Sequence, residues 1–373
     1  MGGSFGAQAY TLSPKGRHLR APALTPSSPK MENLNTPQEV SMSRRNLLRS
    51  LLVLVAFLLP IFGCGRHDSE ETYYLVSTNI QLPYWQEAKA GFMQAAGQLQ
   101  VKAKFVGPDT YDPRGEQKAF EEAVQKKPSG ILVSAADPAT LLIDIDKAIA
   151  AGIPVVTMDA DAPASKRLFF VGTNNYQAGI LGGTRLAQEL KDKGNVVFFT
   201  MPEQTNLAER LRGYREALAR FPDIHIVRVV NIEGDPRVAF DTTDQILGKE
   251  GDKVNAFVCL EAQAGREVAT VLNNRNVHNK VVIAMDTDAD TLDWIEKGVI
   301  VATIAQKPYT MSLVGLHMLD DLHHNKLPRL DGDWSKDSFA PIPAFVDTGT
   351  ALIDKNNLKA IRDAKESATK AGK

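Results

Sequence analysis

Basic residues, cysteines and long apolar runs are in short supply in this chain, and each shortage excludes a class of protein. Lysine and arginine together number 43 against 44 aspartates and glutamates, so the formal net charge is −1. Nucleic-acid-binding proteins normally present a basic face, and this balance therefore argues against a nucleic-acid partner. Two cysteines, Cys64 and Cys259, are too few for a disulfide framework. Cys259 lies in an apolar run and is expected to be a buried small hydrophobic residue.

Signatures of catalysis and of metal binding are also missing. The glycines of 179–183 do not lie between a strand and a helix start, and no Gly-Lys-Ser/Thr follows them, so they form no phosphate loop. No nucleophile elbow is present. His317, His323 and His324 fall on or near one expected helix without partners at metal-ligand spacing. We therefore expect no enzyme activity, no cofactor and no metal site.

The amino-terminal 63 residues have the composition of a targeting segment rather than of a folded domain. Residues 1–41 are rich in Pro, Ser, Gly and Asn, which predicts a disordered extension or a mis-called start. Residues 42–63 have the pattern of a signal peptide, with Arg44, Arg45 and Arg49 ahead of an apolar segment. That segment, 51–62, is too short to span a membrane comfortably.

The signal peptide ends in Ile61-Phe62-Gly63-Cys64, which resembles the lipobox of bacterial lipoproteins. The resemblance implies that the Cys64 thiol receives a diacylglycerol, that Cys64 becomes the new amino terminus, and that the lipid anchors the protein to a membrane. Residues 64–72 would then be a flexible tether in the cell envelope, outside the cytoplasm. Two alternatives remain: a cleaved signal peptide with an incidental cysteine, and a single membrane anchor.

From Tyr73 onward, short β-branched runs alternate with longer amphipathic stretches, which indicates an open α/β sheet built from right-handed crossovers. Near-continuous apolar runs are typical of parallel strands buried on both faces. Each run closes on a polar residue, and ligands of such sheets bind outside the carboxyl ends of the strands. Six runs show this pattern, and their final residues are Ser77, Ser134, Asp159, Thr200, Glu261 and Asp286.

Two aromatic residues, Tyr84 and Trp85, follow Pro83 at the start of the first expected helix, on the same edge as Ser77. An aromatic face in this position can stack on the apolar face of a sugar ring. The alternative is that both rings belong to the core beneath the helix.

Taken in order, several segments resemble the ribose-binding type of periplasmic sugar-binding protein over nearly all of Tyr73 to Ala351. They are Leu-Val-Ser-Thr at 75–78, Pro-Tyr-Trp at 83–85, Ala-Gly-Ile-Pro-Val-Val-Thr-Met-Asp at 151–159, Arg-Leu-Arg-Gly-Tyr at 210–214, Val-Ile-Ala-Met-Asp at 282–286 and Val-Ala-Thr-Ile-Ala-Gln at 301–306. The resemblance implies the type I periplasmic-binding-protein fold: two Rossmann-like α/β lobes with parallel sheets, joined by three hinge crossings.

We expect the N-terminal lobe at residues 73–174 plus 307–340, the C-terminal lobe at 175–306 plus 341–358, and a solvated tail at 359–373. The resemblance also assigns roles by position. Tyr84 and Trp85 match the stacking aromatics, Asp159 the carboxylate that binds ring hydroxyls, and Arg212 the guanidinium that donates two hydrogen bonds. The other expected ligand contacts are Ser77, Ser134, Asp161, Asn175, Glu261, Asp286 and Gln306.

Some of these residues have simpler alternatives. Asp161 caps a turn into Ala162-Pro163 in one interpretation, and Arg212 is a surface helix residue in another. Asn175 is expected chiefly at the first hinge. Ribose itself is disfavoured, because Ala160 follows Asp159 where ribose binders carry an arginine. An excess of carboxylates instead favours another polyhydroxylated or amine-bearing ligand.

We therefore expect a monomeric, lipid-anchored solute-binding protein that closes on a sugar or polyol and delivers it to the permease of an ABC importer. Three alternatives differ from this function, and one of them, the regulator, shares the same core. A ligand-binding partner of a membrane sensor would share the binding chemistry. A lacI-type regulator would need an amino-terminal helix-turn-helix, where this chain has an apolar segment. A glycoside-processing enzyme would use paired carboxylates such as Asp159 and Glu261.

Overall fold

The computed structural model describes residues 68, 70–334 and 336–371, which all belong to one unit of the structure. The expected extension, the signal peptide and Cys64 lie outside the described residues. In the described part of the chain, no helix has both the length and the apolar character needed to cross a membrane.

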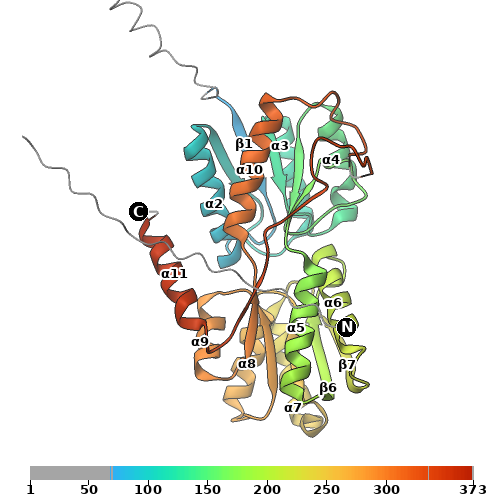
Figure 1. The fold of residues 1–373 in the computed structure, drawn as a ribbon, viewed down its shortest axis with the longest axis vertical. Helices are drawn as coiled ribbons and strands as arrows, with labels where there is room; N and C mark the ends of the chain where they lie inside the picture. The colour runs from blue at the N-terminus through green and yellow to red at the C-terminus, as the bar shows by residue number, and fades with distance from the viewer. Residues whose placement is uncertain (1–67, 69, 335, 372–373) are drawn as a thin grey trace, which may run out of the picture. The chain divides into compact units, whose positions relative to one another are not determined.

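Two six-stranded sheets, each with its own helices, form two lobes of this unit (Figure 1). The N-terminal lobe contains β1 (Thr72–Val76), β2 (Lys102–Val106), β3 (Gly130–Val133), β4 (Val155–Met158), β5 (Phe170–Gly172) and β11 (Phe345–Asp347), with helices α2 (Pro83–Leu99), α3 (Pro113–Gln125), α4 (Pro138–Ala150) and α10 (Pro308–His324). The C-terminal lobe contains β6 (Lys193–Thr200), β7 (Asp223–Asn231), β8 (Ala256–Cys259), β9 (Val281–Met285), β10 (Ala302–Ala305) and β12 (Ala351–Ile353), with α5 (Asn175–Leu190), α6 (Thr205–Leu218), α7 (Pro236–Lys249), α8 (Ala264–Asn274) and α9 (Ala289–Lys297).

The two sheets repeat one strand order. It is β11-β5-β4-β3-β1-β2 in the first sheet and β12-β10-β9-β8-β6-β7 in the second. Every strand pair is parallel except β10 with β12. The expected fold class, two α/β lobes with parallel sheets, is confirmed.

Three helices start at an Asp-Pro pair, which explains where they begin. The side chains of Asp112, Asp137 and Asp235 accept hydrogen bonds from the first main-chain N–H groups of α3, α4 and α7. The proline that follows each aspartate occupies the first helical position, where no donor is needed and where its fixed φ suits the helix.

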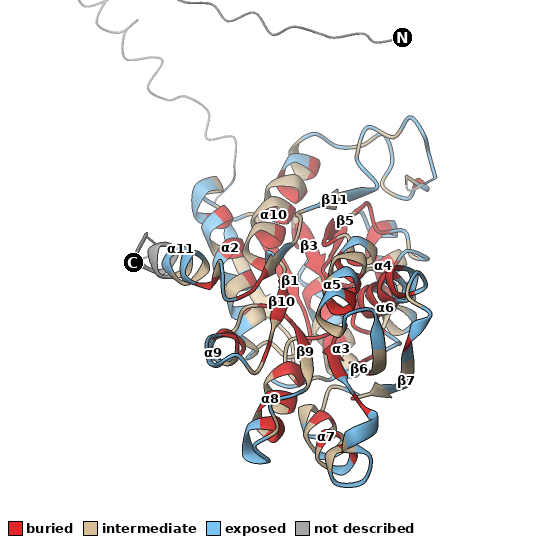
Figure 2. Ribbon diagram, turned by 60° about the horizontal axis from the view of Figure 1, so that its bottom comes forward, coloured by how far each residue is buried: buried red, intermediate tan, exposed pale blue. Residues whose placement is uncertain are grey.

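All six strands expected from the sequence are present, and they form the buried centres of the sheets, red in Figure 2. The strands that were missed lie at edges or at lobe crossings. At the edge of the second sheet, β7 is largely exposed and therefore carries a mixed sequence rather than an apolar run.

The chain crosses between the lobes three times: from β5 to α5, from β10 to α10, and from β11 to β12. The third crossing corrects the expected lobe boundary at residue 341. Because β11 pairs with β5 in the first sheet, residues 345–347 belong to the N-terminal lobe, and the chain crosses at 348–350.

The expected solvated tail also needs a correction. Residues Leu358–Ala371 form helix α11, and Arg362 on this helix pairs with Asp293 and Glu296 of α9 at 2.7 and 3.0 Å. Leu358 is only 6% exposed and belongs to the core of the C-terminal lobe. The start of the helix is therefore attached to the C-terminal lobe, although residues 359, 360, 363 and 364 are exposed as expected of a solvated segment.

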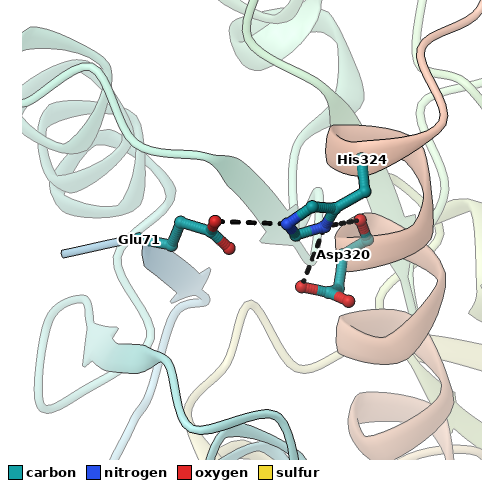
Figure 3. A group of neighbouring side chains, drawn as sticks. All are labelled: Glu71, Asp320 and His324. Carbon is teal, nitrogen blue, oxygen red and sulfur yellow. Dashed lines mark hydrogen bonds and ion pairs between the residues drawn. The ribbon is translucent and has the colours of Figure 1, made fainter. Parts of the chain in front are cut away.

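A cluster of charged side chains joins the start of β1 to the end of α10 (Figure 3). His324 Nδ1 donates to the main-chain oxygen of Asp320 at 2.9 Å, and Nε2 lies 3.2 Å from Oε1 of Glu71. The hydroxyl of Tyr73 donates to the Asp320 carboxylate at 3.2 Å. The hydrogen bond to the Asp320 carbonyl and the charges of Glu71 and Asp320 raise the pKa of His324, whereas burial opposes them.

We predict that this cluster makes the stability of the protein depend on pH. A raised histidine pKa means that the folded state binds the proton more tightly than the unfolded chain does. The stabilisation is complete below the unfolded pKa of about 6.5 and is lost as pH rises through the folded value. Urea unfolding at a series of pH values between about 6 and about 8 should show the free energy of unfolding falling with pH.

His324→Gln should flatten that part of the pH profile. His317→Gln is the matched control, because His317 is a half-buried residue on the same helix and contacts the neutral side chain of Gln98. Other groups titrate in this range, among them His323, whose pKa burial lowers, so the difference between variant and wild type is the informative quantity. Identical slopes for wild type and His324→Gln would contradict the prediction.

Candidate functional site

Two aspartates stand at equivalent positions of the two lobes. Asp159 follows β4 and Asp286 follows β9, and these strands hold the same place in their sheets. Both residues adopt left-handed backbone conformations, with φ of 64° and 67°. Aspartate tolerates this region better than most residues, but it remains a strained position of the kind that gathers at functional sites. Both residues are 8% exposed.

A cavity between the lobes lies at the carboxyl ends of the strands, where ligands of open α/β sheets bind. Seven of the predicted contacts line it: Tyr84, Trp85, Ser134, Asp159, Glu261, Asp286 and Gln306. Four do not: Ser77, Asp161, Asn175 and Arg212. The cavity also has polar walls that the sequence interpretation did not include: Thr78, Asn79, Tyr111, Gln204, Asn206, Arg210 and Gln263.

Asp159 is surrounded by hydrogen-bond donors from both lobes. Tyr84 Oη donates to Oδ1 at 2.6 Å, and Ser134 Oγ and Asn206 Nδ2 lie 3.5 and 3.4 Å from Oδ2. Burial raises the pKa of Asp159, and the hydrogen bond from Tyr84 and the charge of Arg210 oppose that rise. The carboxylate is thus a buried acceptor whose partners a ligand hydroxyl could replace.

The guanidinium in the cavity belongs to Arg210, and the prediction of Arg212 is wrong in position. Arg212 is exposed, pairs with Glu209 at 2.6 Å and lies over the Tyr176 ring, 4.0 Å from its centroid. Arg210 is 2% exposed. Residues two positions apart on a helix point to roughly opposite sides, so Arg210 faces the cavity whereas Arg212 faces solvent.

Close packing of α5 against α6 places Arg210. A Cβ on Gly179 would lie 2.1 Å from the main-chain oxygen of Arg210, and one on Gly213 would lie 2.1 Å from that of Tyr176. The two helices can approach this closely only with glycine at both points. The glycines of 179–183 are therefore packing residues, and Asn206, Arg210 and Tyr214, spaced four apart, form the buried face of α6.

Arg210 is held in place by groups from the hinges and from a strand end. It donates to Oδ1 of Asn175 at the first crossing, to the main-chain oxygen of Leu260 after β8, and to Oε1 of Gln306 at 3.2 Å near the second crossing. Asn175 is buried and therefore acts through Arg210 rather than lining the cavity. Burial lowers the pKa of Arg210, and the charges of Asp286 and Asp159 oppose that fall.

Gln306 links Arg210 to the second aspartate. Its Nε2 donates to Oδ1 of Asp286 at 2.9 Å while its Oε1 accepts from Arg210. Burial raises the pKa of Asp286 to about 7, although Arg210 and the hydrogen bond from Gln306 act against the rise.

Glu261 is in the cavity wall but its oxygens are engaged. They accept from the main-chain N–H groups of Gln263 and Ala264 at 2.8 and 2.5 Å, at the start of α8. Burial raises its pKa, and these two hydrogen bonds oppose the rise. Its carboxylate therefore accepts hydrogen bonds from the first N–H groups of α8, which leaves it less available to a ligand than the carboxylates of Asp159 and Asp286.

Asp161 and Ser77 were expected to contact the ligand, but neither lines the cavity. Asp161 forms two bonds of 2.6 Å with Arg167 and accepts from Thr157 Oγ1 at 2.6 Å. It lies in a neighbouring cavity together with Asn175 and Arg212. Ser77 is fully buried and donates to the main-chain oxygen of Thr78, and Thr78 rather than Ser77 lines the cavity.

Tyr84 and Trp85 were expected either at the ligand site or in the core beneath the helix, and the two residues differ in this respect. Tyr84 and Trp85 both line the cavity, with their rings edge to face at 5.2 Å. Trp85 is 6% exposed and belongs to the core of the N-terminal lobe, whereas Tyr84 reaches Asp159. The pair thus gives the cavity a rigid aromatic wall.

One group in the described part of the chain brings a histidine and two carboxylates together, with ligand atoms of Glu71, Asp320 and His324 within 4.8 Å of one another. The two imidazole nitrogens face different carboxylates, which suits the ion-pair cluster of Figure 3. It lies at the amino-terminal end of β1, whereas the cavity lies at the carboxyl ends of the strands.

We predict that the two arginines of α6 differ sharply in their effect on stability. Arg210→Met should lower the free energy of unfolding by about 3–5 kcal/mol, because it leaves Asp159, Asp286 and the Leu260 carbonyl buried without their cation. Arg212→Met, the matched control, should leave it almost unchanged, because its partner Glu209 is exposed. Urea unfolding measures both, and equal effects would contradict the assignment of Arg210 to the buried position.

Known proteins provide an independent comparison. Residues 73–326 match the family described as "Periplasmic binding protein domain". The D-allose-binding periplasmic protein of Escherichia coli is 25% identical over 260 residues, which cover 67% of this chain and 83% of that protein.

Two solved structures extend the comparison. The arabinose-binding protein AraP from Geobacillus stearothermophilus has 32% identity and a TM-score of 0.66, covering 78% of this chain and 99% of its own. A sugar ABC transporter (sugar-binding protein) from Bacillus halodurans has 33% identity and a TM-score of 0.69, with the same coverage. All three are named as sugar-binding proteins, in agreement with the expectation of a binding protein rather than an enzyme. The chain belongs to the periplasmic binding protein family.

Proposed function

We propose that this protein captures a sugar or a related polyhydroxylated molecule by closing its lobes around it, and that it delivers this ligand to an ABC importer. The observation that carries the proposal is the pairing of Asp159 and Asp286 around Arg210 in one cavity. A carboxylate accepts hydrogen bonds from two neighbouring hydroxyls, while a guanidinium donates to hydroxyl or ring oxygens. The similarity to sugar-binding relatives supports the same ligand class.

The distribution of these groups over the lobes supports binding by closure. Tyr84, Ser134 and Asp159 come from the N-terminal lobe, whereas Asn206, Arg210 and Asp286 come from the C-terminal lobe. A ligand that contacts both sets favours the closed arrangement by its differential affinity for it. The hinge would be formed by the three crossings, with the lobes at residues 73–174, 307–340 and 345–347 and at 175–306 and 351–358.

The location and the anchor are part of the same proposal. The lipobox-like segment ending at Cys64 supports a lipid anchor, and the similarity to periplasmic proteins supports a place outside the cytoplasm. The expected tether at residues 64–72 needs a correction, because Thr72 is the first residue of β1 and Glu71 pairs with His324. A shorter tether that ends before Glu71 would keep the ligand-loaded protein close to a permease. We propose that it acts as a monomer.

The ligand class is tested by thermal unfolding in the presence of pentoses, hexoses, polyols and amino sugars. A ligand that binds only the folded state raises the unfolding temperature once its concentration exceeds Kd. We expect at least one pentose or hexose to do so and to be recovered chemically unchanged. No stabilisation by any of the four classes, or turnover of the ligand, would contradict the proposed function.

Calorimetric titration of the sugar identified in this way should then locate the site. Asp159→Ala and Asp286→Ala should each weaken binding by about 2–4 kcal/mol, as expected when a buried charged acceptor is removed. Affinity should also rise between about pH 6 and about 8, since hydroxyl donors favour the ionised form of Asp286. Asp286→Asn should reduce that pH dependence.

The matched control is Asp161→Asn, since Asp161 stands two residues after Asp159 but lies outside the cavity, paired with Arg167. Its variant should bind the sugar nearly as wild type does. Wild-type affinity in both Asp159→Ala and Asp286→Ala would remove the proposed site.

The anchor is tested separately in cells. Cys64→Ala, or globomycin treatment of the wild type, should move the protein out of the membrane fraction or leave its precursor unprocessed. Immunoblotting of membrane and soluble fractions measures this. Unchanged membrane retention and normal processing in Cys64→Ala would overturn the lipid anchor without affecting the ligand proposal.

A further inference from the structure

The last helix of the chain, α11, is attached to one lobe and reaches the other. Its Leu358 packs into the core of the C-terminal lobe, and Arg362 pairs with Asp293 and Glu296 of α9 in that lobe. Figure 1 shows α11 beside α9, with its far end toward the level of α2. About one turn after Arg362, the side chain of Lys365 extends from the helix and contacts both lobes.

The ammonium of Lys365 bridges two segments, one in each lobe. It lies 3.0 Å from Oε2 of Glu87 on α2 in the N-terminal lobe. It also donates to the main-chain oxygen of Thr287 in the C-terminal lobe at 3.0 Å. Thr287 directly follows Asp286, so the bridge ends one residue from the ligand-binding aspartate.

The bridge also forms part of the cavity wall next to the ligand site. Lys365, Glu87 and Thr287 line a smaller cavity together with Tyr84, Asp286 and Gln306, which line the main cavity as well. Separation of the lobes at this point would lengthen the Lys365–Glu87 contact, because α11 moves with the C-terminal lobe and α2 with the N-terminal lobe.

We propose that α11 is a strap that favours the closed arrangement of the lobes, and that Lys365 is a positioning residue that slows release of the ligand. The inference rests on the proposed function for its ligand. An interaction made only in the closed arrangement raises the closed population and therefore lengthens the lifetime of the complex. The segment after β12 is thereby part of the binding machinery.

The expected size of the effect is modest. The side chains of Lys365 and Glu87 are 39% and 38% exposed, and an ion pair of this exposure changes an equilibrium by about two- to fivefold. Its contribution is also screened by salt and should nearly vanish near about 1 M salt, where the Debye length is ~3 Å.

The test compares Lys365→Met with Lys359→Met in the full chain. Methionine keeps an apolar stem of similar length but removes the charge. Lys359 is the matched control, because it lies on the same helix and pairs with Asp363 of that helix. Stopped-flow release of the sugar found in the thermal screen should be about two- to fivefold faster in Lys365→Met at low salt and unchanged in Lys359→Met.

Glu87→Gln should produce a similar acceleration, and the double variant Glu87→Gln/Lys365→Met should release no faster than either single variant. Equal release rates in wild type and Lys365→Met, or the same acceleration in Lys359→Met, would overturn the strap. A salt-independent acceleration would do so too, since it would point to altered packing rather than to the ion pair.

A second measurement does not depend on the sugar. Small-angle scattering of the ligand-free protein should give a larger radius of gyration for Lys365→Met than for wild type and Lys359→Met. An unchanged radius together with an unchanged release rate rejects the strap while leaving sugar binding intact. If no sugar stabilises the wild type, the proposed function fails, and the scattering result alone decides whether α11 restrains the lobes.

Discussion

The buried positive charge of Arg210 is the interaction on which the arrangement of the cleft depends. A guanidinium removed from water is costly unless its donors are satisfied and opposite charges are near. Here Asn175, Leu260 and Gln306 accept its hydrogen bonds, and Asp159 and Asp286 supply negative charge. Because Asn175 and Gln306 lie beside the first and second crossings, the same guanidinium that lines the cavity also links the two crossing segments.

The two aspartates show how a repeated lobe produces a two-sided site. Each follows an equivalent strand, each has a left-handed backbone, and each is almost buried. Burial raises the pKa of both carboxyl groups, and Arg210 acts against that rise in both. A ligand with vicinal hydroxyls would replace water and neighbouring side chains as the donor to these carboxylates, and it would reach both lobes only when they are close together.

The lobes and the hinge crossings also account for the corrections. An edge strand such as β7 has one side in solvent, so its sequence lacks the apolar run that revealed the central strands. The short strand β11 joins the first sheet through pairing with β5, a long-range contact that no local pattern encodes. Helix α11 carries a polar sequence, yet ion pairs with α9 and the bridge through Lys365 dock it on the protein.

The sequence by itself determined the alternation of strands and helices, the strand ends at Asp159 and Asp286, and the aromatic pair at the first helix start. Apolar periodicity and strand-end polarity are local properties, which is why they can be read without a structure. Only the tertiary structure decided that Arg210 rather than Arg212 lines the cavity, and that Asp161 forms an ion pair with Arg167. The reason is physical: which face of α6 is buried depends on its close contact with α5 through Gly179 and Gly213, and that contact joins residues from separate parts of the chain.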